Sequence, residues 1–261
     1  MFNDPKDSPA IQRAISGEYS VSVKQVLKKS WQLTQQNKLP VLFAFLFAVA
    51  INIGAQHIMS LMLGGGEGGN EGIDGVANLI ATLIAAPFWG GLDMMALRRS
   101  RGAPVQVTDV FNYLKYFAPL ALVQVLITIL LQLGLVLLLL PAIYLAVGTS
   151  FAIMLMLDRG ISPTKAVYLS IRAAHHQWFK LFLVFLALTP AMGLAAIPLA
   201  VYLSGQGMEQ VQSTMMFSLL LIWAVPMLYF AKGVMFDAIF GDATVEEPVE
   251  RSSTDDGSFS A

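Results

Sequence analysis

Residues 116 to 157 read YFAPLALVQVLITILLQLGLVLLLLPAIYLAVGTSFAIMLML and carry no charged side chain. A helix of about 20 residues crosses the roughly 30 Å hydrocarbon core of a bilayer, so this stretch is too long for one crossing and long enough for two. Gly134 and Pro141 lie near its middle, where a helix can end or bend. We therefore predict a hairpin of two transmembrane helices with almost no loop.

The composition also indicates a membrane protein. Of 261 residues, 56% are hydrophobic and 13% are charged, whereas soluble domains are about one quarter charged. The net charge of −1 gives no reason to expect a nucleic-acid partner. The chain has no cysteine, which excludes disulfides and thiolate sites. The first apolar run begins only at Leu39, behind a charged segment, so we expect an uncleaved anchor rather than a signal peptide.

Four further apolar runs complete a prediction of six transmembrane helices. Two precede the central stretch and two follow it, at about residues 39–62, 76–97, 181–203 and 214–236. The predicted fold is an all-α, polytopic membrane protein. Its predicted parts are a flexible arm (1–19), a six-span helical membrane domain (20–240) and a disordered, acidic and serine-rich tail (241–261).

The basic residues alternate with the predicted spans. Six Lys and Arg precede the first span, four lie between spans two and three, four lie between spans four and five, and two lie at and after the end of span six. Together these are all 16 basic residues of the chain, and the other three connections contain none. Because Lys and Arg are enriched in cytoplasmic loops, the pattern predicts that both termini are cytoplasmic.

Each odd-numbered span is preceded by a short amphipathic segment. In the first, Val23, Val26, Leu27 and Trp31 share one helical face opposite a group of lysines. We expect three such helices to lie in the membrane surface, with their basic residues at anionic headgroups. The residues that we expect to contact the surface are Lys24, Lys28, Lys29, Trp31, Arg172 and Trp178.

The second and third of these helices have recognisable start signals. Thr108 or Asp109 can cap the second helix. Ser162 followed by Pro163 is a cap residue with proline at the first helical position, which predicts where the third helix begins.

A few polar residues fall within the spans. Asp93 lies about one turn inside span two, and an ionisable residue at this depth is a functional candidate by default. Lys232 and Asp237 lie at the same end of span six and are its potential partners. We expect Asp93 to pair with Lys232, either as a structural tie or as part of a functional site. Gln124 and Gln132 of span three could hydrogen-bond between helices or line a polar path.

The order of five short motifs resembles a known group of proteins. The motifs are VLKKSW (26–31), RRSRG (98–102) with VTDVF (107–111), LLPAIY (139–144) and DRGISP (158–163). Over residues 21–240 the chain resembles the YciC-type family of uncharacterised bacterial inner-membrane proteins, and is similar to the membrane domain of some glycerophosphodiester phosphodiesterases. Such proteins usually have glycine after the proline at 141, where this chain has Ala142. The resemblance implies a helical fold in a bacterial inner membrane and brings no catalytic residues.

Two functions are compatible with these features. No span contains a His-Glu-x-x-His pair or a serine, histidine and aspartate set on one side, so we expect no enzyme, no cofactor and no metal site. The first hypothesis is a non-enzymatic protein that acts through anionic lipid headgroups, a membrane-protein partner or a second copy of itself. The alternative is a small-solute transporter or channel, because proline-broken helices and Asn52, Asp93, Gln124 and Gln132 could form a polar path.

Overall fold

A computed structural model describes residues 8–65, 71–203, 205 and 207–241. All regular secondary structure in these residues is helical, which confirms the predicted all-α class. The elements are α1 (Pro9–Ser16), α2 (Val23–Leu63), α3 (Glu71–Ser100), η2 (Val107–Tyr116), α4 (Phe117–Leu137), α5 (Leu139–Thr149), α6 (Ala152–Arg159), α7 (Pro163–His176), α8 (Trp178–Leu203), α9 (Met208–Thr214), η3 (Met215–Leu220) and α10 (Leu221–Phe240).

Six helical stretches in the described residues are long and apolar enough to cross a membrane. They are Val23–Leu63, Gly72–Ser100, Val107–Leu137, Leu139–Arg159, Trp178–Pro198 and Met215–Phe240. The prediction of six spans is confirmed, and the chain is a multi-pass helical membrane protein. We call the ends of the spans that adjoin the Lys- and Arg-containing segments the basic side, and the ends at the α2–α3, α4–α5 and α8–α9 turns the far side.

The central hairpin turns within a single residue. α4 ends at Leu137 and α5 begins at Leu139, so Leu138 alone separates them. Pro141 lies in the first turn of α5, where backbone N–H groups have no intrahelical acceptor, so the missing N–H costs nothing. A Cβ atom on Gly134 would lie 2.8 Å from the Cα atom of Ala142, so glycine is needed for the two helices to approach this closely.

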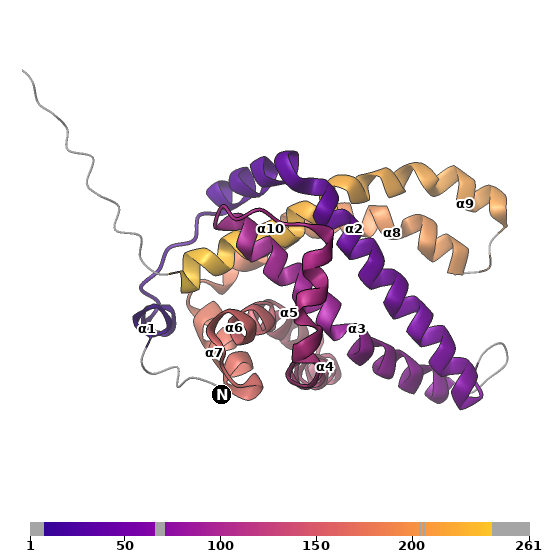
Figure 1. The fold of residues 1–261 in the computed structure, drawn as a ribbon, viewed down its shortest axis with the longest axis horizontal. Helices are drawn as coiled ribbons and strands as arrows, with labels where there is room; N and C mark the ends of the chain where they lie inside the picture. Colours follow the sequence, from indigo (N-terminus) through magenta and orange to yellow (C-terminus); the bar gives the residue numbers. More distant parts are fainter. Residues whose placement is uncertain (1–7, 66–70, 204, 206, 242–261) are drawn as a thin grey trace, which may run out of the picture.

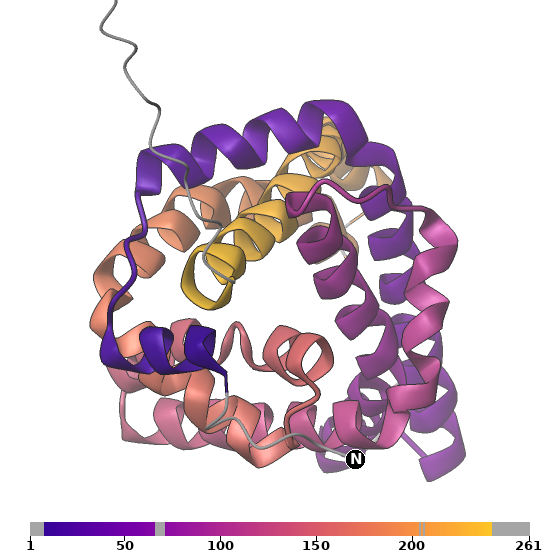
Figure 2. The ribbon, with the colours of Figure 1, turned by 60° about the vertical axis from the view of Figure 1, so that its left-hand side comes forward.

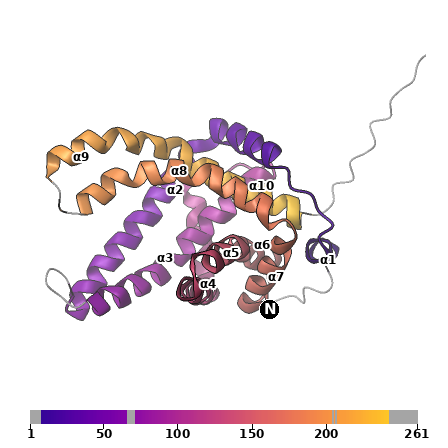
Figure 3. The same ribbon diagram turned by 180° about the vertical axis from the view of Figure 1, so that it is seen from behind.

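Three of the other spans pack directly against α10. α10 contacts α2, α3 and α8, and α4 packs along α5. Figure 1 shows the α2–α3 hairpin and the hairpin that contains α8 and α9 diverging toward their tips. The helices α4 to α7 lie together and pack against α3 and α8. The view from behind, in Figure 3, shows α8 running beside α10. The helices are therefore held together on the basic side and separate toward the far side.

A kink divides α2 where the sequence predicts the boundary between the first surface helix and the first span. Asn37 has non-helical dihedral angles (φ −142°, ψ 33°). Pro40 follows three residues later, and a proline ring within a helix clashes with the carbonyl group four residues before it. The proline therefore accounts for the bend between residues 23–36 and the span that follows.

The other two amphipathic segments are also helical. α7 begins at Pro163 after the cap residue Ser162, as predicted. The predicted cap of the second helix is wrong: η2 is preceded by Gln106, whose backbone N–H donates to Asp109 Oδ2 at 3.0 Å. The buried residues of the first and third helices face other helices of the protein. Their position in the membrane surface stays a prediction.

The predicted flexible arm is wrong for residues 9–16, which form α1. Ala10, Ile11 and Ala14 occupy one face of this helix and are buried against α7 and α10. Ser8 and Pro9 start the helix and Gly17, with φ 82°, ends it. Figure 2 shows the chain leaving α1 and running along the outside of the molecule to α2. The predicted tail, 241–261, lies outside the described residues after Gly241.

Candidate functional site

The predicted pair between Asp93 and Lys232 is present. Lys232 Nζ on α10 lies 2.6 Å from Asp93 Oδ1 on α3, and the two side chains are 18% and 4% exposed. α10 approaches α3 closely at the next residue, because a Cβ atom on Gly233 would lie 2.7 Å from the carbonyl oxygen of Ala96. The pair ties span two to span six, as the sequence predicts.

Aromatic side chains surround this pair and link a third helix to it. The Lys232 ammonium lies 5.7 Å from the ring centroid of Tyr229 on the same helix. Tyr229 contacts Phe45 of α2, and Phe45 contacts Trp89 of α3, both in edge-to-face geometry with centroids 6.3 and 5.8 Å apart. The charged pair therefore lies where α2, α3 and α10 meet.

Asp237 is not a partner of Asp93, which corrects the alternative drawn from the sequence. It accepts a hydrogen bond from Arg101 Nε at 3.0 Å. Arg101 also donates to both carboxylate oxygens of Asp158, at 2.6 and 3.1 Å. Burial lowers the pKa of Arg101, but the hydrogen bonds and charges of Asp158 and Asp237 outweigh burial and raise it. Arg101 thus joins the end of α6 to the end of α10.

Two more arginines bind the C-terminal end of α10. Arg159 donates to the carbonyl oxygen of Phe240, and Arg13 of α1 donates to that of Gly241 at 2.8 Å. The last carbonyl groups of a helix have no intrahelical donor and carry partial negative charge, so cations are favourable there. Three of the six arginines in the described residues, Arg13, Arg101 and Arg159, therefore hold helix ends together.

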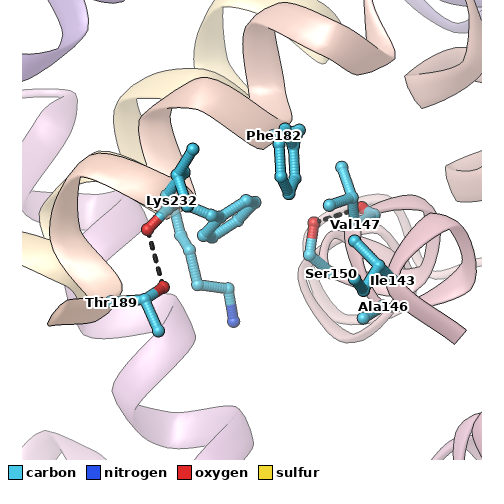
Figure 4. A pocket seen from close by; sticks show the side chains of 9 residues that line it. Ile143, Ala146, Val147, Ser150, Phe182, Thr189 and Lys232 are labelled. Carbon is cyan, nitrogen blue, oxygen red and sulfur yellow. Dashed lines mark hydrogen bonds between the residues drawn. The ribbon is translucent and has the colours of Figure 1, made fainter. Parts of the chain in front are cut away.

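A pocket of about 490 Å³ lies between α5, α8 and α10. Its walls are mainly apolar, and Figure 4 shows Lys232 on one side of it and Val147 and Ser150 on the other. The residues that line it are Ile143, Ala146, Val147, Ser150, Phe182, Phe185, Leu186, Thr189 and Lys232. Lys232 therefore forms the ion pair with Asp93 of α3 and also lines the pocket.

The predicted polar residues of the spans are not part of this pocket. Gln124 is half-buried and Gln132 is exposed, and neither lines it. Asn52 on α2 is also absent from its lining. The structure therefore does not bring Asn52, Gln124 and Gln132 together with Lys232 at this site.

The predicted surface residues fall into two groups. Lys24, Lys28 and Lys29 are exposed, as is Arg172, which is within 3.5 Å of the Tyr168 hydroxyl. The two tryptophans instead pack against other aromatic residues. Trp31 is partly exposed but stacks on Trp223 of α10 at 5.2 Å, and the Lys38 ammonium lies 3.6 Å from the centre of the Trp223 ring.

Trp178 is held within the protein rather than standing free at its surface. Its ring stacks between Tyr144 and Phe182, with centroids 5.8 and 5.1 Å away, and its N–H donates to the carbonyl oxygen of Tyr144. The sequence predicted Trp178 as a contact of the third surface helix with the membrane, but in the structure α8 begins at this residue. The change of helix axis turns the ring toward α5.

The sequence also gave no signal for the residues that fix the N-terminal segment. The Tyr19 hydroxyl donates to the carbonyl oxygen of Ala173 at 2.6 Å, and Gln177 contacts the backbone of Tyr19 and Val21. Burial raises the pKa of Tyr19 to about 12, against the opposing effect of a hydrogen bond from the backbone of Gln177. This segment therefore positions the start of α2 relative to α7.

Within the described residues, no group of three or more His, Asp and Glu side chains is arranged to hold a metal ion. His175 and His176 instead contact the Tyr144 hydroxyl and the carbonyl oxygen of Ile15, both at 2.9 Å. No activity can be transferred from a relative: comparisons with protein-family models, with curated proteins and with solved structures find no match.

Proposed function

We propose that this chain is a non-enzymatic protein of the bacterial inner membrane that acts through contacts of its basic side with anionic lipid headgroups. In this proposal both termini are cytoplasmic, because every Lys and Arg then falls on the cytoplasmic side of the six spans. The sequence resemblance to the YciC-type family agrees with the same membrane. A membrane-protein partner or a second copy of the chain would dock on the same side.

The proposal rests on a difference in the partners of two sets of basic residues. Arg13, Arg101, Arg159 and Lys232 are held by carboxylates or helix-end carbonyl groups. Lys24, Lys28 and Lys29, in contrast, are exposed and have no acidic partner among the described residues. Their charges are therefore available to an external anion.

The helix that carries these lysines is fixed to the rest of the protein. Val26, Ser30 and Thr34 form its buried stripe, whereas the three lysines are exposed. The kink at Asn37 then directs the chain into the first span. A basic residue near an anionic leaflet contributes about 1 kcal/mol, so three lysines held beside the first span provide a sizeable preference for anionic lipid.

The transporter alternative has less support. The polar residues that would line its path, Asn52, Gln124 and Gln132, are not in the 490 Å³ pocket. That pocket also opens among lipid-facing side chains of the spans, since Ala146, Leu186 and Thr189 are exposed. We therefore favour the lipid-contact function.

The test compares two triple variants. In one, Lys24, Lys28 and Lys29 are all replaced by glutamine. In the other, the same three residues are replaced by arginine, which conserves the charge. The purified full-length proteins are placed in nanodiscs made from an equal mixture of phosphatidylcholine and phosphatidylglycerol. The enrichment of phosphatidylglycerol next to the protein is measured by native mass spectrometry of the lipids that stay bound.

We expect enrichment to fall in the glutamine variant, by up to roughly fivefold for each lysine, and to persist in the arginine variant. The difference should vanish at about 1 M salt, where the Debye length is about 3 Å. Equal enrichment in the glutamine variant and the wild type would contradict the proposal.

A further inference from the structure

We propose that the pocket between α5, α8 and α10 holds one acyl chain of a membrane glycerolipid, whose uncharged ester carbonyl accepts a hydrogen bond from Lys232. This inference goes beyond the proposed function, because the site lies within the spans and does not use the exposed lysines.

The walls fit a hydrocarbon chain. Ile143 and Val147 of α5 face Phe182, Phe185 and Leu186 of α8 across the pocket. Its volume of about 490 Å³ lies within the range of roughly 300–1,000 Å³ that is usual for small-molecule sites, which are mostly apolar with a few polar groups. In Figure 4 the apolar side chains surround an open space, and the Lys232 ammonium lies between Thr189 and the α5 side chains.

The mouth of the pocket is on the lipid-facing surface. Leu186 is 50% exposed, and Ala146 and Thr189, on opposite helices, are exposed as well. All three lie within helices that are apolar enough to span a membrane. A ligand that enters by this mouth comes from the bilayer, which makes a lipid chain the occupant rather than a water-soluble solute.

The charge around Lys232 favours an uncharged ligand group. Asp93 Oδ1 lies 2.6 Å from the ammonium and compensates its charge. An additional anion would leave a net negative charge where the dielectric constant is low, and such a charge is costly. An ammonium has three donors, and among the described residues Asp93 is its hydrogen-bond acceptor. A neutral carbonyl oxygen can therefore use a remaining donor without adding charge.

The two hydroxyl groups of the pocket do not compete with Lys232 as hydrogen-bond donors to a ligand. Ser150 donates to the carbonyl oxygen of Val147 at 2.7 Å, and Thr189 donates to that of Phe185 at 2.6 Å. Each hydroxyl hydrogen is therefore used within its own helix. Lys232 is the donor that the pocket can offer to a ligand.

The depth of Lys232 matches the level of lipid ester groups. Asp237 belongs to the charged cluster at the end of α10 and lies five residues beyond Lys232, a rise of about 7.5 Å along a helix. The headgroup layer of each leaflet is about 5–8 Å thick, the difference between the whole bilayer and its hydrocarbon core. If the charged cluster lies in the headgroups, Lys232 lies at the boundary with the hydrocarbon, where glycerol esters are located.

The experiment uses the full-length protein in nanodiscs that contain phosphatidylcholine with a photoreactive group on one acyl chain. After illumination, labelled peptides are identified by mass spectrometry. We expect labelling of peptides from α5 and α8 around Ala146 and Leu186. Ala146→Trp should abolish most of this labelling because the indole fills the mouth, whereas Ala187→Trp, at an exposed alanine of α8 outside the lining, should not.

Equal labelling of Ala146→Trp and the wild type would overturn the proposal, as would an equal loss in both tryptophan variants. A second comparison leaves the protein unchanged. An ether-linked competitor, which lacks the ester carbonyl, should compete about tenfold less well than its ester-linked counterpart, as expected for one hydrogen bond to a charged group. Equal competition would exclude the ester contact.

A free fatty acid is the third competitor and tests the charge argument. We expect it to compete less well than the ester, and stronger competition by the fatty acid would contradict the choice of an uncharged group. Failure of the pocket proposal can be distinguished from failure of the proposed function. Phosphatidylcholine has no net charge, so the variant with Lys24, Lys28 and Lys29 changed to glutamine should keep its pocket labelling even where its phosphatidylglycerol enrichment is lost.

Discussion

The basic side and the far side of this protein are built differently. Near the basic end of α3, Leu92 and the run from Met94 to Leu97 are buried. Near its far end, Val76 and Leu79 are exposed, and at the hairpin tips Met62 and Val136 are 74% and 85% exposed. The diverging hairpins in Figure 1 show the same difference in the arrangement of the backbone.

This difference follows from what holds helices together in a bilayer. Lipid chains are as apolar as leucine, so association depends on close packing and polar contacts rather than on the hydrophobic effect. The ion pairs of the described residues involve Asp93, Asp109, Asp158 and Asp237, all at or near the basic ends of spans. Cohesion should therefore be concentrated there, while the far ends are surrounded by lipid.

The largest effect should come from removing one member of the buried pair. Asp93→Ala leaves the Lys232 ammonium without its carboxylate, and breaking such a pair costs about 3 kcal/mol. We expect a clear fall in the unfolding midpoint of the protein in detergent. The double variant Asp93→Leu, Lys232→Leu should recover much of this loss, because it leaves no buried charge. A double variant no more stable than the single one would contradict the role of the pair.

A matched pair of leucines compares the two sides directly. Leu97 is fully buried on the basic side, whereas Leu137 at the far tip is 69% exposed. Leu97→Ala should cost about 2 kcal/mol through lost packing, and Leu137→Ala should cost about 0.5 kcal/mol or less. The same unfolding measurement tests both. Similar costs at the two positions would mean that cohesion is not concentrated on the basic side.

The arginine bridge should have a smaller effect. Arg101→Ala removes the contacts that join Asp158 to Asp237, and because the side chain is about one third exposed we expect a cost of about 1 kcal/mol. Arg172→Ala, at an exposed arginine without an ion pair among the described residues, is the control. The difference in stability between the two variants should decrease in high salt. A difference that salt does not change would show that packing, rather than charge, is responsible.

The smallest effect concerns the N-terminal segment. Tyr19→Phe removes the hydrogen bond to Ala173 and should cost about 1 kcal/mol of local stability, seen as about fivefold faster amide exchange in α1.

The pKa of Tyr19 gives this segment a pH dependence. Because burial raises that pKa to about 12, the docked form is fully stabilised below pH 10 and loses stability as the pH rises from about 10 to 12. Tyr19→Phe should remove this dependence. An unchanged pH profile would contradict the docking role of the hydroxyl group.

The sequence predicts the spans well because a bilayer imposes a length on each apolar run. The turn at Leu138 falls between the two helix breakers, Gly134 and Pro141, and the kink at Asn37 comes just before Pro40. The pair between Asp93 and Lys232 was also predictable, since two opposite charges at one depth have few other partners. Helix-breaking residues, the lengths of apolar runs and the depth of charged residues in the membrane were sufficient to predict these features.

Other features depend on contacts between distant segments. α1 docks through a small apolar face formed by Ala10, Ile11 and Ala14. The polar composition of the N-terminal segment gave no indication of this face. Asp237 was predicted as a potential partner of Asp93, but Arg101, which is distant in sequence, reaches it across the helix ends and binds it instead. Apart from Lys232, Ser150 and Thr189, the pocket is formed by apolar residues of three spans that look ordinary one by one, so no sequence pattern indicated it.

The most direct test of the account is the sidedness of the membrane insertion, and the absence of native cysteine makes it simple. Thr108→Cys on the basic side and Glu209→Cys on the far side are exposed positions for a membrane-impermeant maleimide. If the basic side is cytoplasmic, Glu209→Cys is labelled in intact cells and Thr108→Cys is labelled only after the membrane is opened. Labelling of both positions from the same face of intact cells would contradict the account.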